Sequence, residues 1–178
     1  MNQFGKNEIL NLLIEFDSLV KEPVSLIICG GAAGILEHEF NRSTLDIDII
    51  HSSPRLIELQ NIRKLIADQH DISDQWLNDG AKGFIDYLPD DFQSRLIPVK
   101  IKFNKLKASV LGKADLLVMK LAAFRPEDLM DISRMKIDTE TISIIKRTVD
   151  KIALFDNKKA HIMTLFLKEK GLWGKDSV

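Results

Sequence analysis

The chain has little of what would mark a secreted, membrane or duplex-binding protein. A single cysteine, Cys29, leaves no disulfide framework within the chain. No apolar run approaches the roughly 18 residues that a membrane-spanning helix needs, and the N-terminal residues contain no apolar signal segment. Surfaces for duplex nucleic acid usually carry a basic excess, whereas the formal net charge here is -1. We therefore expect a cytoplasmic protein with no membrane contact.

What the chain does have is enough apolar residues for a core. Hydrophobic residues make up 45% of the 178 residues and charged residues 29%, a balance typical of a globular protein rather than a disordered one. The length fits one domain of ordinary size. We expect a single domain over residues 1–178, with a core sheet region over 24–111 and a helical C-terminal region over 112–178.

Hydrophobic spacing predicts the order of the secondary-structure elements. Helices are expected at 7–20, 32–40, 54–67, 113–124, from 126 onward, 140–152 and 158–170. Strands are expected at 24–29, 44–50, 96–103 and 107–111, with one or two short strands among the loops of 71–95. Because strands cluster in the middle and helices at the ends, the pattern favours an α/β (α+β) fold, a mixed central sheet flanked by helices.

Two short segments have residues that suggest chemistry. Gly30 and Gly31 follow a buried strand and open a helix, so their backbone amides can approach phosphate oxygens. On the next predicted strand, Asp46 and Asp48 are one residue apart and therefore share a face. Two carboxylates on one face repel each other unless a cation lies between them, and Mg²⁺ prefers such oxygen ligands. The plain alternatives are a solvated strand face and an ordinary strand-to-helix turn.

The same residues resemble a known family. The diglycine, a short helix and then Arg42-Ser43-Thr44-Leu45-Asp46-Ile47-Asp48 is similar to the signature of the DNA-polymerase-beta-type nucleotidyltransferase superfamily. The segment from Leu116 to Ile132, with Lys120 and Arg125-Pro126-Glu127-Asp128-Leu129-Met130-Asp131, resembles small bacterial members, including uncharacterised proteins and abortive-infection type toxins. A patch at Gln75-Trp76-Leu77-Asn78-Asp79 also resembles the uncharacterised group.

The resemblance implies a nucleotidyltransferase fold and a role for each matching residue. Gly30 and Gly31 would approach the nucleotide phosphates, and Asp46 and Asp48 would bind Mg²⁺ or Mn²⁺. Lys120 would lie near the nucleotide or the attacking group. The remaining two roles concern the loop before the acidic strand, where Arg42 and Thr44 would shape the backbone and contact phosphate.

The implied activity is metal-dependent transfer of a nucleotidyl group from an NTP, with ATP as first choice. The acceptor would be a hydroxyl group on RNA, protein or a small molecule. Lys100 and Lys102 alternate on the predicted strand 96–103 and would attract RNA if that face looks into the site. For Lys120 there is an equal alternative, a buried ion pair with Asp128 or Asp131, because its helix is mostly apolar.

Two departures from the family pattern support a different function. Ala32 stands where the family usually has a serine whose hydroxyl contacts phosphate. A third carboxylate, often found on a later strand, has no clear counterpart, although Asp79 or Asp86 are candidates. The alternative is a catalytically weak or inactive protein of the same fold that binds a partner protein in a toxin-antitoxin or phage-defence pair.

Overall fold

A computed structural model of the chain describes residues 3–173. The chain divides into two compact units. The first comprises the chain up to Ile85 together with Gln93–Gly112, and the second comprises Asp86–Phe92 and the chain from Lys113 onward. Within the described part, none of the helices is long and apolar enough to cross a membrane.

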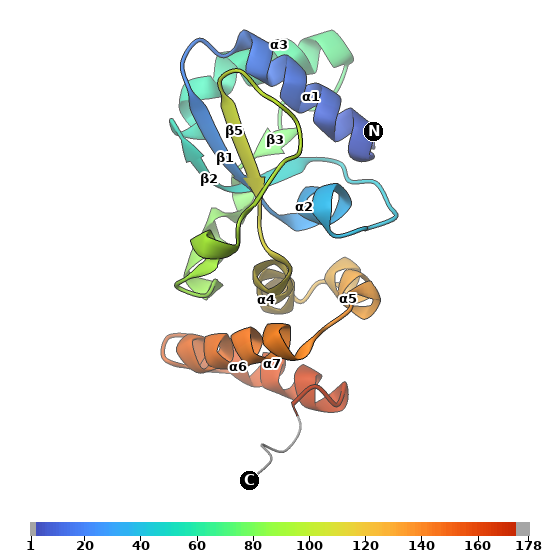
Figure 1. Cartoon of the computed structure of the whole chain (residues 1–178), viewed down its shortest axis with the longest axis vertical. Coiled ribbons are helices and arrows are strands. Elements are labelled where there is room, and N and C mark those ends of the chain that lie inside the picture. The colour runs from blue at the N-terminus through green and yellow to red at the C-terminus, as the bar shows by residue number, and fades with distance from the viewer. Residues whose placement is uncertain (1–2, 174–178) are drawn as a thin grey trace. The chain divides into compact units, whose positions relative to one another are not determined.

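The first unit is built on a five-stranded mixed sheet with the order β3-β2-β1-β5-β4. Its strands are β1 (Val24–Ile28), β2 (Ile47–Ser53), β3 (Leu77–Asn78), β4 (Ile97–Pro98) and β5 (Leu106–Val110). Strand β1 is central: it pairs antiparallel with β2 and parallel with β5, as the ribbon shows (Figure 1). The outer pairs are parallel for β2–β3 and antiparallel for β5–β4. The predicted mixed sheet flanked by helices is therefore confirmed.

An extra residue interrupts the pairing of β1 with β2. Ile27 is opposite His51 and Ile28 is opposite Ile49, so Ile50 has no partner on β1 at this bulge. Ile49 and Ile50 are both buried, which breaks the alternation of burial along the strand. The strand predicted over 44–50 begins only at Ile47, and Leu45, which lies before it, is 49% exposed.

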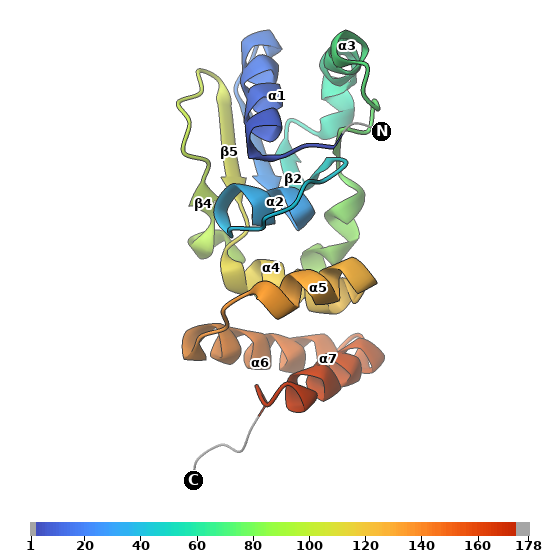
Figure 2. The ribbon, with the colours of Figure 1, turned by 90° about the vertical axis from the view of Figure 1, so that its right-hand side faces the viewer.

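The first unit also contains three α-helices, the 3-10 helix η1 (Leu56–Leu59) and most of the 3-10 helices η2 (Gly80–Tyr87) and η3 (Phe92–Arg95). Helix α1 (Lys6–Leu19) contacts α2 (Gly30–Glu37) and α3 (Gln60–His70), and Figure 2 shows α1 and α3 side by side. The fully buried Trp76 ties this layer to β3, because its indole N–H donates to the Arg63 carbonyl at 3.0 Å. The Trp76 ring also makes an edge contact with Phe16 of α1, with ring centroids 6.4 Å apart.

Two predictions of local structure were wrong in this unit. Pro54 was expected in the first turn of a helix, but the Ser53–Pro54 bond is cis and the following 3-10 helix η1 begins at Leu56. The predicted strand 96–103 is reduced to β4, and the stretch from Val99 to Phe103 is irregular. Lys100 and Lys102 are therefore not neighbours on a strand face. Lys100 is exposed and forms an ion pair with Glu37, with 3.5 Å between Nζ and Oε2.

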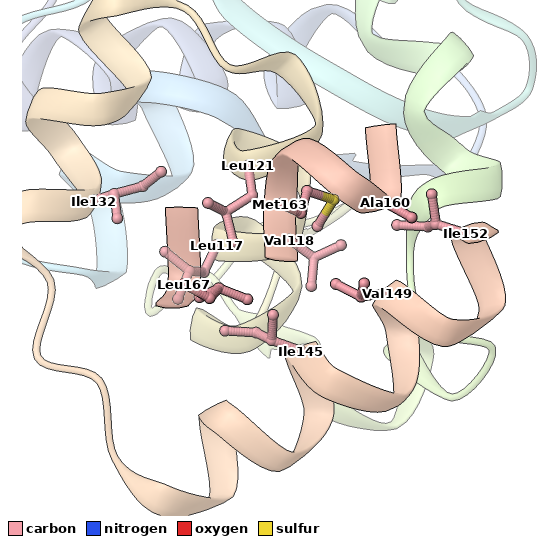
Figure 3. Packing of buried hydrophobic residues seen from close by; sticks show 10 residues of the cluster. All are labelled: Leu117, Val118, Leu121, Ile132, Ile145, Val149, Ile152, Ala160, Met163 and Leu167. Carbon is pink, nitrogen blue, oxygen red and sulfur yellow. The ribbon is translucent and has the colours of Figure 1, made fainter. Parts of the chain in front are cut away.

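The second unit is helical, as predicted for the C-terminal region. Its helices are α4 (Lys113–Ala123), α5 (Pro126–Arg134), α6 (Thr139–Ala153) and α7 (Asn157–Glu169). Three of these helices begin at a local signal: Pro126 occupies the first turn of α5, and the Asp138 and Asp156 carboxylates accept backbone N–H groups at the starts of α6 and α7. Aliphatic side chains from all four helices form one buried cluster, shown with its residues labelled in Figure 3.

A buried carboxylate fastens the start of β5 to α1. Asp17 accepts backbone N–H groups from Asn104, Lys105 and Leu106, with distances of 2.8, 2.8 and 2.7 Å. Burial by itself raises the pKa of Asp17, but the three hydrogen bonds outweigh it and hold the pKa below the ordinary value of 3.8. No pattern in the sequence indicated a role for Asp17.

We predict that Asp17→Asn lowers the free energy of unfolding of the first unit by about 1–3 kcal/mol at neutral pH, because one charged acceptor is lost. The folded pKa is depressed, so the contribution of Asp17 is complete above the ordinary value of 3.8 and fades as the pH falls below it. Urea unfolding followed by Trp76 fluorescence, in a Trp173→Phe background, measures the difference. An equal difference between the two proteins at neutral and strongly acidic pH would contradict this account; the exposed Asp68→Asn serves as control.

Candidate functional site

A backbone hydrogen bond joins the residue before the diglycine to strand β2. The Cys29 amide donates to the Asp48 carbonyl at 2.9 Å, which places the residue before the helix directly beside the strand residue. Helix α2 then begins at Gly30, two residues earlier than the sequence indicated. The Ala33 amide donates to the Cys29 carbonyl, so the amides before it have no carbonyl acceptor within the helix.

Gly30 is required at its position for two reasons. Its φ angle is +61°, in the left-handed region that side chains other than glycine rarely adopt. A Cβ atom built there would also lie 2.7 Å from Oδ2 of Asp48, closer than carbon and oxygen can approach. The missing side chain therefore makes the space into which the Asp48 carboxylate points.

Gly31 lies beside the side chains of Arg42 and Thr44. A Cβ atom built on it would lie 2.9 Å from Nη2 of Arg42 and 3.0 Å from Oγ1 of Thr44. Arg42 also donates to the Ser43 carbonyl at 2.9 Å. Its guanidinium carbon lies over the Phe40 ring, 5.9 Å from the ring centroid. These distances place the Arg42 guanidinium and the Thr44 hydroxyl beside the start of α2.

The position of Thr44 is held from outside the motif. Its backbone pairs with Phe4 as an isolated antiparallel bridge, with the Phe4 amide donating to the Thr44 carbonyl at 2.7 Å and the reverse bond at 3.0 Å. Phe4 is itself buried. The N-terminal segment therefore fixes the loop between α2 and β2, a contact that no pattern in the sequence indicated.

Asp46 lies just before β2 and is held by the neighbouring strand β3. Nδ2 of Asn78 donates to Oδ2 of Asp46 at 3.2 Å. Asn78 is opposite Asp48 in the parallel pairing of β2 with β3. Asp46 and Asp48 are both half-buried, whereas Ile47 and Ile49 are fully buried. The carboxylates thus lie at one end of the sheet, between the diglycine bend and Asn78.

Among the described residues, no third acidic side chain joins Asp46 and Asp48 to form a metal-binding group. Within residues 3–173 there is no group of three or more histidine, cysteine, aspartate or glutamate side chains arranged to hold a metal ion. Of the two candidates, Asp79 forms an ion pair with Lys82, and Asp86 belongs to the second unit. Ala32 is buried and offers no hydroxyl. The side chain next to Asp46 is instead the neutral amide of Asn78.

The residues that are present fit a divalent cation bound together with phosphate. Two carboxylates are the number that Mg²⁺ commonly takes from a protein when substrate phosphates complete its coordination. The lack of a Cβ at Gly30 lets the Asp48 carboxylate lie against the backbone at the start of α2, where a cation bound to it would also be close to the helix amides. Arg42 adds a positive charge near the same helix start.

Lys120 belongs to the second unit and is buried there. Its ammonium group is 3.0 Å from Oδ1 of Asp128 and 2.7 Å from Oδ2 of Asp131, and all three side chains are at most 3% exposed. Arg125 adds a bond to Oδ2 of Asp128 at 2.9 Å. Both partners named from the sequence are therefore observed. A catalytic role for Lys120 stays a prediction, and its contacts favour the buried ion pair.

A comparison of the chain with protein families gives a match that includes these site residues. Residues 8–165 match the model of a family described as a nucleotidyltransferase of unknown function (DUF6036). The chain belongs to this family. The match includes the diglycine, both aspartates, Asn78 and the Lys120 segment, so nucleotidyltransferase membership no longer rests on short motifs alone. No curated protein and no solved structure matches the chain.

Asn78 and Phe4 are the site residues that sequence reasoning missed. Asn78 lies within the patch 75–79 that resembles other small nucleotidyltransferases, so a signal was present, but nothing in the spacing showed that β3 would adjoin β2. Phe4 gave no signal, because a single bridge between residues 40 positions apart leaves no periodic pattern.

We predict that Lys120→Met lowers the free energy of unfolding of the second unit by about 3–5 kcal/mol, because two buried carboxylates lose their shared cation. Hydrogen exchange of α4 and α5, together with thermal unfolding, measures the loss. Adding Asp131→Asn to this variant should recover part of it. Lys151→Met, which removes a partly exposed ion pair with Asp90, is the control and should cost less than about 1 kcal/mol. A Lys120→Met protein of normal stability that has lost nucleotidyl transfer would contradict the structural role.

Proposed function

We propose that the protein transfers a nucleotidyl group from an NTP to a hydroxyl acceptor, with ATP as the first candidate donor. The observation that supports this most is the meeting of Gly30 with Asp48: a carboxylate points into the space left by a glycine at the start of a helix. Membership of a nucleotidyltransferase family agrees with it.

In this proposal each group has a distinct task. Backbone amides at the start of α2 bind phosphate oxygens, assisted by the positive end of the helix and by Arg42. Asp46 and Asp48 hold Mg²⁺ or Mn²⁺, which neutralises charge on the triphosphate when it is bound. Thr44, whose Oγ1 lies beside Gly31, shapes the loop and contacts a phosphate oxygen in this proposal. The protein contributes mainly position and charge.

The reaction itself is a displacement at phosphorus. The acceptor oxygen forms a bond to the α-phosphorus while the bond from that phosphorus to the β-phosphate oxygen breaks, and pyrophosphate leaves. The hydroxyl proton passes to water or to a base. We propose that the acceptor hydroxyl belongs to RNA, a protein or a small molecule.

A binding role without catalysis is the second proposal. The neutral Asn78 next to Asp46, and Ala32 in place of a serine, both favour it over a fast enzyme. The setting proposed for this role is a partner protein in a toxin-antitoxin or phage-defence pair. Nucleotide would then still bind at Gly30 and Gly31, and no labelled product would form.

We predict that ATP with Mg²⁺ raises the melting temperature of the wild type and that Asp46→Asn combined with Asp48→Asn abolishes most of this rise, because the cation loses both carboxylates. Asp68→Asn combined with Asp150→Asn removes the same charge from exposed helix positions and should leave the rise intact. Incubation with α-labelled NTPs and total RNA or protein then measures transfer.

The outcomes separate the two proposals. A rise with labelled product supports the enzyme, and a rise without product supports the binding role. Absence of any rise in the wild type overturns nucleotide binding, and a rise that survives in the Asp46 and Asp48 double variant overturns the assignment of the metal ligands.

A further inference from the structure

Asn78 lies on the two-residue strand β3, and several contacts fix the position of this strand. The Ile47 amide donates to the Trp76 carbonyl at 2.6 Å, and Ile47 and Asp48 pair with Leu77 and Asn78. Trp76 is fully buried and is fixed by its bond to the Arg63 carbonyl. The side chain of Asn78 is therefore presented to the acidic strand from a rigid support.

The hydrogen bonds of Asn78 define which way its amide faces. Oδ1 accepts the Gly80 amide at 3.0 Å. Nδ2 donates to Oδ2 of Asp46 at 3.2 Å and to the Gln75 carbonyl at 3.3 Å. Turning the amide over would set a donor against the Gly80 N–H and an oxygen against two acceptors, so the network allows one orientation.

We propose that Asn78 is a positioning residue that orients Asp46 and, by offering an N–H instead of an oxygen, keeps the site dependent on the nucleotide for holding its cation. This inference rests on the proposed function. An amide N–H cannot ligate a cation, so the protein supplies two carboxylates at this place and the phosphates must supply the rest. Cation and nucleotide then bind together, and the cation alone binds weakly.

The charge balance gives the inference a direction that can be tested. Asn78→Asp adds a third carboxylate beside Asp46 while retaining an oxygen for the Gly80 amide. Three neighbouring carboxylates repel each other and attract a divalent cation more strongly than two do. Asn78→Ala instead removes the donor that orients Asp46, and the loss of such outer partners typically costs about 10–100-fold in metal affinity.

Binding of Mn²⁺, followed by the electron paramagnetic resonance of the free ion, distinguishes the two effects. Titrations are made with and without a non-hydrolysable ATP analogue. For the wild type we expect weak binding of Mn²⁺ alone and much tighter binding with the analogue. Asn78→Asp should tighten binding of Mn²⁺ alone by roughly tenfold or more, and Asn78→Ala should weaken binding in the presence of the analogue by about tenfold.

Opposite changes in the two variants are the result that a merely structural role would not give, because damage to β3 weakens both. Asn61→Asp, an exposed position on α3, adds the same charge elsewhere and should change neither titration. Unchanged Mn²⁺ binding in both Asn78 variants, with a wild type that binds Mn²⁺ and the analogue, overturns this inference alone. A wild type that binds neither overturns the proposed function beneath it. If Asn78→Asp does not fold, unchanged Mn²⁺ binding by Asn78→Ala in the presence of the analogue still overturns the inference.

Discussion

The hydrogen bond from the Cys29 amide to the Asp48 carbonyl holds the candidate site together. It fixes the backbone of the acidic strand against the residue that precedes the diglycine, and the left-handed φ of Gly30 then turns the chain into α2. Because residue 30 has no side chain, the Asp48 carboxylate can occupy the space next to it. Arg42 and Thr44 reach the same helix start from the loop that follows, and Asn78 holds Asp46 from β3.

Much of the fold could be predicted from the sequence because its signals are local. Spacing of apolar residues located α1, α4, α6 and α7, and Pro126 marked the start of α5. The predicted strand 107–111 is observed as β5, whereas the predicted strand 96–103 is reduced to Ile97–Pro98, which pairs with β5. Long-range pairing, which decides where a strand ends, leaves little trace in a single sequence.

For the candidate site, the sequence located residues better than it located their supports. Spacing placed Asp46 and Asp48 one residue apart, yet it wrongly extended a regular strand to Thr44, because the bridge to Phe4 and the bulge at Ile50 are tertiary features. Asn78 could not be assigned, because the parallel pairing of β3 with β2 joins residues about 30 positions apart. The amide of Asn78 beside Asp46 was not predicted either.

The second unit illustrates how a motif can serve packing. Lys120, Asp128, Asp131 and Arg125 form a network of opposite charges among aliphatic side chains, and each buried charge there has a partner. Such networks cost free energy to bury and are destabilising to break. Resemblance to the lysine segment of other nucleotidyltransferases is thus compatible with a role in building α4 against α5.

The central claim is that a divalent cation and a nucleoside triphosphate meet at Asp46 and Asp48. Anomalous diffraction from crystals grown with Mn²⁺ and a non-hydrolysable ATP analogue locates the ion directly. The account predicts one Mn²⁺ peak bonded to oxygens of both carboxylates, with the phosphates of the analogue against the amides of Gly30 and Gly31. An analogue bound elsewhere on the protein, or bound here with Mn²⁺ away from both aspartates, would contradict it.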